Sequence, residues 1–251
     1  MAYTYYLADV FTTLLFGGNP LAVFPDAQGL DEQTMLHIAR ELNLSETTFV
    51  FPPADPAHTF RLRIYTPGGE VPFAGHPTVG SAFVLAAIGR IPLTGEETRI
   101  LFEEGVGPVP VSIFAEQGKP VSSRLTTARL PELGPPPPSI PALAAILSLA
   151  EAEFLNDAHK PEAWSVGLPF LFVPVRNQAA LAQVKINATA YDAVMSEYPA
   201  VGIFVFTPEA AGEGVTAQGR MWAPMLGGLE DPATGSACAA MAGYWAAREP
   251  Q

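Results

Sequence analysis

Two stretches of the chain, GHPTVGSA at residues 75–82 and EDPATGSA at residues 230–237, share a proline followed three residues later by Gly-Ser-Ala. Each stretch runs into residues with almost no polar face, which predicts helices over 78–88 and 234–247. A helix that is apolar all round must be surrounded by other elements. Because β-like runs such as VPVSIFA and FLFVPV accompany both helices, we predict two halves of one design, each a curled sheet around a buried helix.

The composition favours an α+β fold. The chain has 251 residues, of which 49% are hydrophobic, enough for one large or two modest cores. Its 26 prolines and 22 glycines are too many for a helical bundle and separate many short strands. We predict two pseudo-symmetric domains, each a barrel-like, mostly antiparallel sheet around a central helix. In the first half we expect strands over 3–10, 21–24, 47–51 and 60–65, and a helix over 31–41 that starts at Asp31.

The stretch GPPPPSIP marks the division between the halves. Its four successive prolines, residues 135–138, hold the chain extended and cannot continue a central strand. No other stretch resembles a linker in composition. We therefore predict two domains, over residues 1–130 and 131–251.

The net charge of −12 and the lack of any Lys or Arg cluster argue against nucleic acid and anionic membranes as partners. The N-terminus shows no charged-then-apolar leader, and no uncharged apolar run is long enough to span a bilayer. We therefore expect a cytoplasmic protein.

Metal and nucleotide sites have no support in the sequence. Cys238 is the single cysteine, and its place in the second apolar helix indicates a small hydrophobic packing residue. His37, His58 and His159 lack metal-ligand spacing. There is no GxxxxGK loop and no GxGxxG after a strand. We expect neither metal nor organic cofactor.

The repeated Gly-Ser at a helix start suggests an anion site. Such a start presents unpaired N–H groups and the positive end of the helix dipole. If the two halves face each other, two such tips would meet in one cleft, where a small carboxylate could bind. The alternative is that Gly-Ser-Ala only permits close packing.

Three titratable residues could act in such a cleft. Glu46 stands where a helix gives way to a strand, and a carboxylate there could exchange protons near neutrality. His76 and Asp231 hold equivalent positions in the two repeats, although a histidine cannot replace an aspartate as a helix cap. The alternatives are an exposed glutamate closing a loop, a structural histidine and a capping acid.

Five motifs together resemble the PhzF-like phenazine-biosynthesis isomerase family, whose members have the diaminopimelate epimerase-like fold. They run in order from Ala8 to Tyr244: DVFTTLLFGGNPLAVFPD, ELNLSETTFVF, YTPGGEVPFAGHPTVGSA, GLPFLFVPV and EDPATGSACAAMAGY. The resemblance implies a homodimer with an active site between two domains. It also implies a cofactor-free isomerase that moves a proton on a cyclic amino acid, dihydro-hydroxyanthranilate.

The resemblance also implies roles for individual residues. The family's catalytic glutamate falls on Glu46 of NLSET, its histidine on His76 of AGHP and its aspartate on Asp231 of DPATGS. The residues expected to hold the substrate carboxylate are Asn19, Gly75, Gly235 and Ser236.

Three hypotheses follow. The first is an isomerase of a small, cyclic amino or hydroxy carboxylic acid in which Glu46 takes a proton and returns it elsewhere. Epimerases of this fold use one cysteine from each domain, and the first half of this chain has none. The second hypothesis is a protein that binds small carboxylates without turnover. The third is a purely structural or partner-binding role, which a large exposed apolar patch away from the cleft would indicate.

Overall fold

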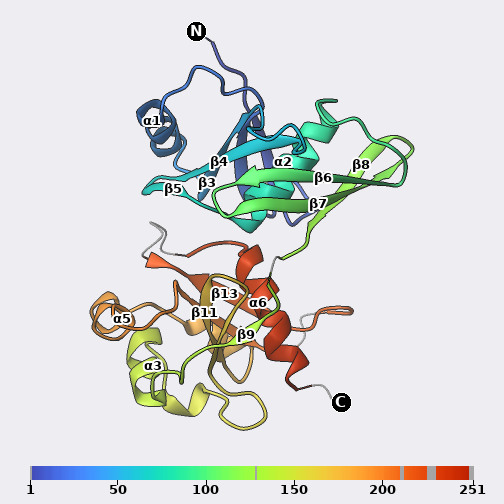
Figure 1. Cartoon of the computed structure of the whole chain (residues 1–251). Coiled ribbons are helices and arrows are strands. Elements are labelled where there is room, and N and C mark those ends of the chain that lie inside the picture. Colours follow the sequence, from blue (N-terminus) through green and yellow to red (C-terminus); the bar gives the residue numbers. More distant parts are fainter. Residues whose placement is uncertain (1, 128, 210–211, 225–229, 249–251) are drawn as a thin grey trace. The chain divides into compact units, whose positions relative to one another are not determined.

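The computed structural model describes residues 2–127, 129–209, 212–224 and 230–248. The chain divides into two compact units, Met1–Ala128 and Arg129–Gln251, called unit 1 and unit 2 below (Figure 1). Each unit has its own sheet and its own buried apolar clusters.

The described part of unit 1, residues 2–127, holds eight strands and two helices. They are β1 (Tyr6–Val10), β2 (Asn19–Phe24), α1 (Glu32–Leu42), β3 (Glu46–Phe51), β4 (Phe60–Thr66), β5 (Gly69–Val71), α2 (Gly75–Ala87), β6 (Glu97–Glu104), β7 (Gly107–Glu116) and β8 (Lys119–Leu125). The strand order is β1-β2-β3-β4-β6-β7-β8, and β5 pairs with β4. The β2–β3 and β4–β6 pairs are parallel, and the others are antiparallel.

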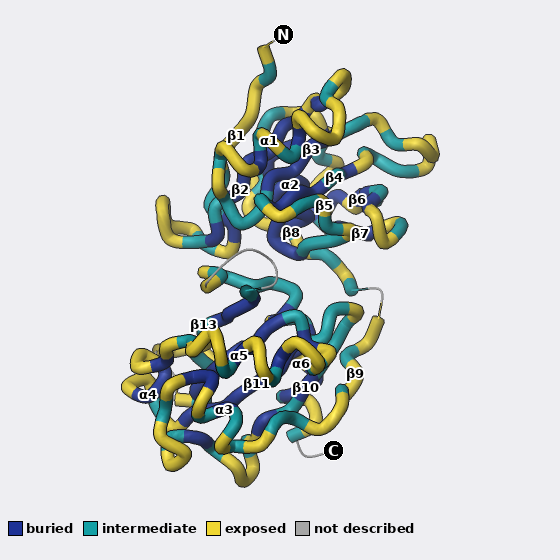
Figure 2. Tube along the Cα trace, turned by 90° about the vertical axis from the view of Figure 1, so that its left-hand side faces the viewer, coloured by how far each residue is buried: buried dark blue, intermediate teal, exposed yellow. Residues whose placement is uncertain are grey.

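Helix α2 is the centre of unit 1. It contacts β1 and β2 at one end of the strand order and β7 and β8 at the other, so the sheet curls around it (Figure 1). Eleven of its thirteen residues are buried, and Figure 2 shows it in dark blue inside the sheet. Helix α2 therefore lacks a polar face because it is enclosed on all sides, as the sequence predicts.

The outer side of the same sheet carries α1. Asp31 caps this helix by accepting a hydrogen bond from the Thr34 amide at 2.7 Å. Met35 and Ala39 are buried against Phe24, Phe49 and Tyr65 in a cluster separate from the one around α2. The helix predicted over 31–41 is thus confirmed, with bounds one residue later at each end.

Among its described residues, unit 2 contains a five-stranded sheet and five helical segments with given bounds. They are β9 (Glu132–Leu133), α3 (Ile140–Leu147), the 3-10 turn η1 (Glu151–Glu153), β10 (Glu162–Ser165), β11 (Pro169–Pro174), α4 (Gln178–Gln183), α5 (Ala188–Met195), β12 (Ile203–Thr207), β13 (Gln218–Trp222) and α6 (Gly235–Ala246). The strand order is β13-β12-β11-β10-β9, with only β11 and β12 parallel.

The alternation of side chains along β11 and β12 gives this sheet two buried faces. Phe170 and Phe172 point toward α6, in a cluster that includes Ala240 and Tyr244. The residues between and after them, such as Leu171, point toward the other face, which α3, α4 and α5 cover. The continuous apolar run of β11 therefore reflects a strand buried on both sides.

The predicted α+β class is confirmed, with a difference between the halves. Eight strands enclose α2, whereas α6 lies on one face of a five-stranded sheet and contacts β9, β10 and β11. The proline run of residues 135–138 lies inside unit 2, between β9 and α3.

The predicted start of the first repeat's helix is wrong. Helix α2 begins at Gly75, three residues before the expected Thr78, so His76 and Pro77 lie in its first turn. Proline is tolerated there because first-turn N–H groups have no partner within the helix. The end was better predicted: Gly89, with φ of 76°, follows the C-cap residue Ile88.

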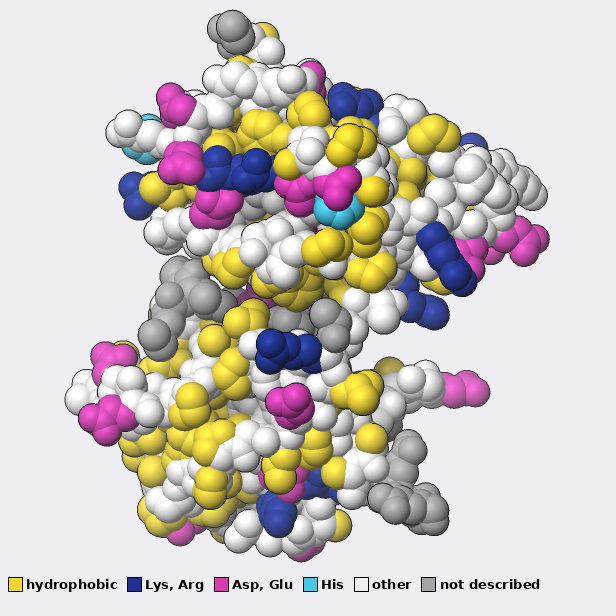
Figure 3. All heavy atoms as spheres, viewed as in Figure 1, with side chains coloured by type: hydrophobic (Ala, Val, Ile, Leu, Met, Phe, Trp, Pro, Cys, Tyr) yellow, Lys and Arg dark blue, Asp and Glu magenta, His cyan; other side chains and the backbone are white. Residues whose placement is uncertain are grey.

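The described residues contain no helix that is both long and apolar enough to cross a membrane. They also contain no group of three or more His, Cys, Asp or Glu side chains arranged to hold a metal ion. On the face shown in Figure 3, the Lys and Arg side chains lie beside Asp and Glu and form no basic patch there, in keeping with the acidic composition.

Candidate active site

Four of the predicted site residues lie at one edge of the sheet of unit 1. Strands β2 and β3 are parallel and begin at this edge, β2 at Asn19 and β3 at Glu46, which stands opposite Leu21. Asn19 is fully buried, and the Glu46 side chain is 17% exposed.

The turn before Glu46 is made by Asn43, whose left-handed backbone (φ of 50°) ends α1. The first turn of α2 contributes Gly75 and His76 to the same edge.

Glu46 and His76 form a close pair. The Oε2 atom of Glu46 lies 3.5 Å from Nε2 of His76, whose side chain is only 5% exposed. The imidazole also donates a hydrogen bond to the Pro20 carbonyl. Because Nε2 makes no hydrogen bond within the described part of the chain, the donor to Pro20 is Nδ1.

Burial decides the charge of His76. It lowers the pKa of the imidazole to about 4, against a smaller opposing effect of the Pro20 hydrogen bond. At neutral pH His76 is therefore uncharged, with its proton on Nδ1. Its Nε2 atom then presents a lone pair, an acceptor, toward the Glu46 carboxyl.

The start of α2 has no side-chain cap. Its N-cap residue is Ala74, whose side chain cannot accept a hydrogen bond from the first-turn N–H groups. Gly75, expected to bind a carboxylate through its main chain, is the first helical residue and is buried. An anion reaching this turn would meet backbone N–H groups and the positive end of the helix dipole.

The predicted site residues of the second repeat gather in unit 2. Asp231 forms an isolated bridge with Met221 at the end of β13, and its amide donates to the Met221 carbonyl at 2.9 Å. The Asp231 carboxylate accepts a short hydrogen bond from the Thr234 hydroxyl. Helix α6 then begins at Gly235 and Ser236, both half-buried, and Thr234 makes no side-chain cap bond to it.

Cys238 corrects another prediction. It was expected to pack as a small hydrophobic residue inside the second helix, but it is exposed. Helix α6 is covered by the sheet on one side only, and its buried positions are Ala237, Ala240, Met241, Gly243 and Tyr244. On the helix circle Cys238 lies outside the arc that these residues occupy, so its side chain points away from the sheet.

Sequence reasoning missed one buried carboxyl group, Glu104. It ends β6, is 6% exposed, and lies 2.7 Å from the Thr78 hydroxyl of α2. Burial raises the pKa of Glu104 to about 8, against a smaller lowering by Thr78. A signal was present: Thr98, Ile100 and Phe102 occupy the inward positions of β6, and Glu104 continues their period of two.

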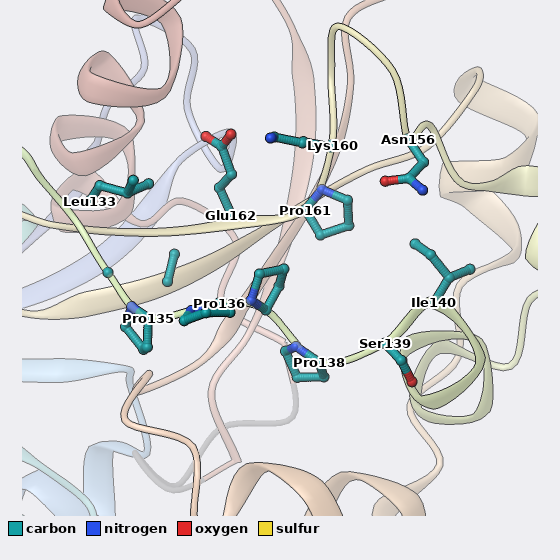
Figure 4. Close-up of a pocket in the computed structure, with 13 residues that line it drawn as sticks. Leu133, Pro135, Pro136, Pro138, Ser139, Ile140, Asn156, Lys160, Pro161 and Glu162 are labelled. Carbon is teal, nitrogen blue, oxygen red and sulfur yellow. The ribbon is translucent and has the colours of Figure 1, made fainter.

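A surface pocket in unit 2 lies apart from these residues. Its volume is about 400 Å³, and Figure 4 shows its proline-rich wall and the polar ends of Lys160 and Glu162. Glu162 is already engaged, because it pairs with Arg248 at 3.0 Å and accepts from the Trp164 indole. None of the predicted site residues lines this pocket. Its lining consists of Leu133, Gly134, Pro135, Pro136, Pro137, Pro138, Ser139, Ile140, Asn156, Lys160, Pro161, Glu162 and Ala163.

Comparison with known proteins places the chain in a family. The model of the phenazine biosynthesis-like protein family, PhzC-PhzF, matches residues 8–250. A protein of Mesorhizobium japonicum named as an uncharacterized isomerase is 41% identical over 244 residues, which cover 95% of this chain and 79% of that protein. The trans-2,3-dihydro-3-hydroxyanthranilate isomerase of Pseudomonas aeruginosa is 33% identical over 239 residues, covering 95% of this chain and 78% of the enzyme.

A solved structure agrees with the sequence relatives. The phenazine biosynthesis protein of the PhzF family from Bacillus anthracis superposes with a TM-score of 0.85 at 28% identity, covering 96% of this chain and 79% of that one. The predicted family resemblance is therefore confirmed over nearly the whole chain. The chain belongs to the phenazine biosynthesis-like, PhzC-PhzF family, and it is an isomerase.

Proposed function

We propose that this isomerase moves a proton on a small, cyclic amino or hydroxy carboxylic acid, with Glu46 as the proton carrier and no cofactor. The observation that carries the proposal is the pairing of Glu46 with a neutral histidine: Glu46 Oε2 lies 3.5 Å from His76 Nε2, and burial holds the pKa of His76 at about 4. A relative with the name trans-2,3-dihydro-3-hydroxyanthranilate isomerase supports a substrate of this class.

The pair suits a carboxylate that takes up a proton and returns it. Ionised Glu46 abstracts a proton from a substrate carbon and becomes a carboxylic acid. The new O–H can donate to the lone pair on His76 Nε2, so the histidine orients and stabilises the protonated form. The Pro20 carbonyl holds Nδ1–H, which keeps the tautomer that this step needs. Glu46 then delivers the proton to a second carbon, which completes the isomerisation.

The remaining predicted residues have roles in binding. The first-turn N–H groups at Gly75 in α2 and at Gly235 in α6, with Ser236 and Asn19, would hold the substrate carboxylate. Asp231 would contact the substrate's polar substituents.

The test is incorporation of deuterium from D₂O into trans-2,3-dihydro-3-hydroxyanthranilate, diaminopimelate, proline and hydroxyproline, followed by mass spectrometry. We expect Glu46→Gln to reduce exchange by roughly a thousandfold, because it removes the proton carrier and keeps the shape. Glu41→Gln is the matched control, since Glu41 is an exposed carboxylate near the end of α1.

Exchange by the wild type and Glu41→Gln but not by Glu46→Gln would support the proposal. Equal exchange by all three proteins would remove Glu46 from the mechanism. Asp231→Asn tests unit 2 in the same assay, and an unchanged rate and substrate affinity in that variant would restrict the site to unit 1.

A further inference from the structure

Glu104 is a buried acid that the proposed proton transfer does not use. It is the last residue of β6, and its side chain points inward. Its Oε1 atom is 2.7 Å from Oγ1 of Thr78, two residues after His76 in α2. Its Oε2 atom is buried and has no hydrogen-bond partner among the described residues. An ionised carboxylate with one oxygen left in this state would bear a large desolvation cost.

The hydrogen-bond geometry fits a protonated Glu104 and not an ionised one. The Thr78 hydroxyl has one hydrogen and lies 2.8 Å from the Ala74 carbonyl oxygen, which can only accept. If Thr78 donates to Ala74, the proton between Thr78 and Glu104 must belong to Glu104. A neutral Glu104 therefore donates to Thr78, and Thr78 donates to Ala74, so that each hydrogen in this chain has an acceptor and Oε2 is an uncharged carbonyl oxygen. The raised pKa of Glu104, about 8, agrees with this assignment.

Ionisation of Glu104 would reverse this chain. The carboxylate would draw the Thr78 hydroxyl hydrogen away from Ala74. The Ala74 carbonyl would then keep only the long contact with the Thr78 amide, at 3.3 Å. Ala74 is the N-cap of α2 and immediately precedes Gly75 and His76. A change at this carbonyl therefore acts on the turn that carries the histidine.

We propose that Glu104 is a positioning residue: in its protonated form it holds the first turn of α2, and with it His76, through Thr78 and the Ala74 carbonyl. The consequence for turnover rests on the proposed function, because it assumes that His76 orients Glu46. The link from Glu104 to His76 does not depend on any substrate.

Other titratable groups near this end of β6 are engaged elsewhere. Glu103 points to the opposite face and contacts His58 at 3.2 Å and Arg61 at 3.8 Å. On β5, Glu70 pairs with Arg63 at 2.8 Å. The segment between β5 and α2, residues 72–74, is Pro-Phe-Ala and has no titratable side chain, and β7 places Gly107 opposite Glu104. In α2 the remaining titratable group is His76 itself, and it is uncharged well above its pKa of about 4.

The test uses NMR of the imidazole C–H signals in the whole, substrate-free protein. The chain has four histidines, and the His76 signals are assigned by their absence from His76→Asn. We expect a titration step in the His76 signals centred near pH 8 in the wild type, because the raised pKa of Glu104, and not that of a histidine, lies there. Glu104→Gln should abolish the step, because its amide donates to Thr78 at every pH.

Two further variants keep the test decisive. Thr78→Val removes the link and should also abolish the step, even if Glu104→Gln folds poorly. Glu103→Gln, the neighbouring carboxyl on the other face of β6, should leave the step in place. A wild type without the step, or a step that persists in both Glu104→Gln and Thr78→Val, would overturn the proposal.

A second readout connects the link to turnover. In the deuterium-exchange assay, wild-type kcat should fall above about pH 8 and the fall should be missing in Glu104→Gln, while KM changes little. A titration step in the NMR spectra without any deuterium exchange would support the link from Glu104 to His76 and reject the proposed function. Deuterium exchange that needs Glu46, without the NMR step, would support the proposed function and reject the link.

Discussion

The two copies of the repeat begin their helices at different places. In the first copy the helix starts at Gly75, so that Gly80 and Ser81 lie in its second turn. In the second copy it starts at Gly235, the position that corresponds to Gly80, and the residue before it, Thr234, is extended. The same Gly-Ser-Ala is thus interior in one copy and terminal in the other.

The side chains between the proline and the glycine account for this difference. Thr78 donates its hydroxyl to the Ala74 carbonyl and ties the added turn back onto the chain. The corresponding residue of the second copy is Ala233, which has no such group. There Asp231 bridges to Met221 instead and accepts from Thr234, which keeps the chain extended. A repeat therefore specifies that a helix is present, and single polar side chains specify where it begins.

The largest expected effect is a loss of folding stability in acid, caused by His76 in the first copy. His76 has an ordinary pKa of 6.5 when unfolded and about 4 when folded. Between these values only the unfolded chain binds the proton, so stability is complete above pH 6.5 and falls as the pH drops toward 4. The loss attributable to His76 is on the order of 3 kcal/mol.

Urea unfolding at pH 7, 5.5 and 4 measures this loss. In His76→Asn, which keeps a donor for Pro20, the decline should be smaller than in the wild type by about that amount, on the order of 3 kcal/mol. Asp231→Asn, at the matched position of the second copy, should still show the part of the stability decline that is due to His76. Equal declines in the wild type and His76→Asn would contradict the assignment of a buried, neutral His76.

A smaller effect is expected from Thr78→Val. The variant has nearly the same shape, but it removes the hydroxyl that serves both Ala74 and Glu104. We expect a loss of about 1–3 kcal/mol in the free energy of unfolding near pH 7, because buried polar groups lose their partner. Thr78→Ser should recover most of the loss. Equal stability of the valine variant and the wild type would mean that the hydroxyl does not hold this turn.

The smallest effect is expected from Ala233→Thr, which gives the second copy the first copy's residue. The bridge between Asp231 and Met221 should still keep the chain extended, so the free energy of unfolding should change by no more than about 0.5 kcal/mol. Backbone chemical shifts would show whether α6 still begins at Gly235. An α6 lengthened by a turn would show that the hydroxyl alone sets the helix start.

Much of the fold could be predicted because it rests on periodicity. The apolar circumference of α2 and the alternation of side chains along β11 and β12 indicate which faces are buried. The motifs single out Glu46 and His76, but the contact between the two side chains cannot be predicted from their spacing in the sequence. It arises because the parallel strands β2 and β3 begin at the edge of the sheet where α2 starts.

The sequence by itself determined the α+β class, the two helices of the repeat and the residues most suited to proton chemistry. Only the tertiary structure decided the starts of those helices, the neutral state of His76, the exposure of Cys238 and the burial of Glu104. The physical reason is that hydrogen-bond partners and desolvation depend on neighbours distant in the chain, such as Thr78 for Glu104 and Pro20 for His76.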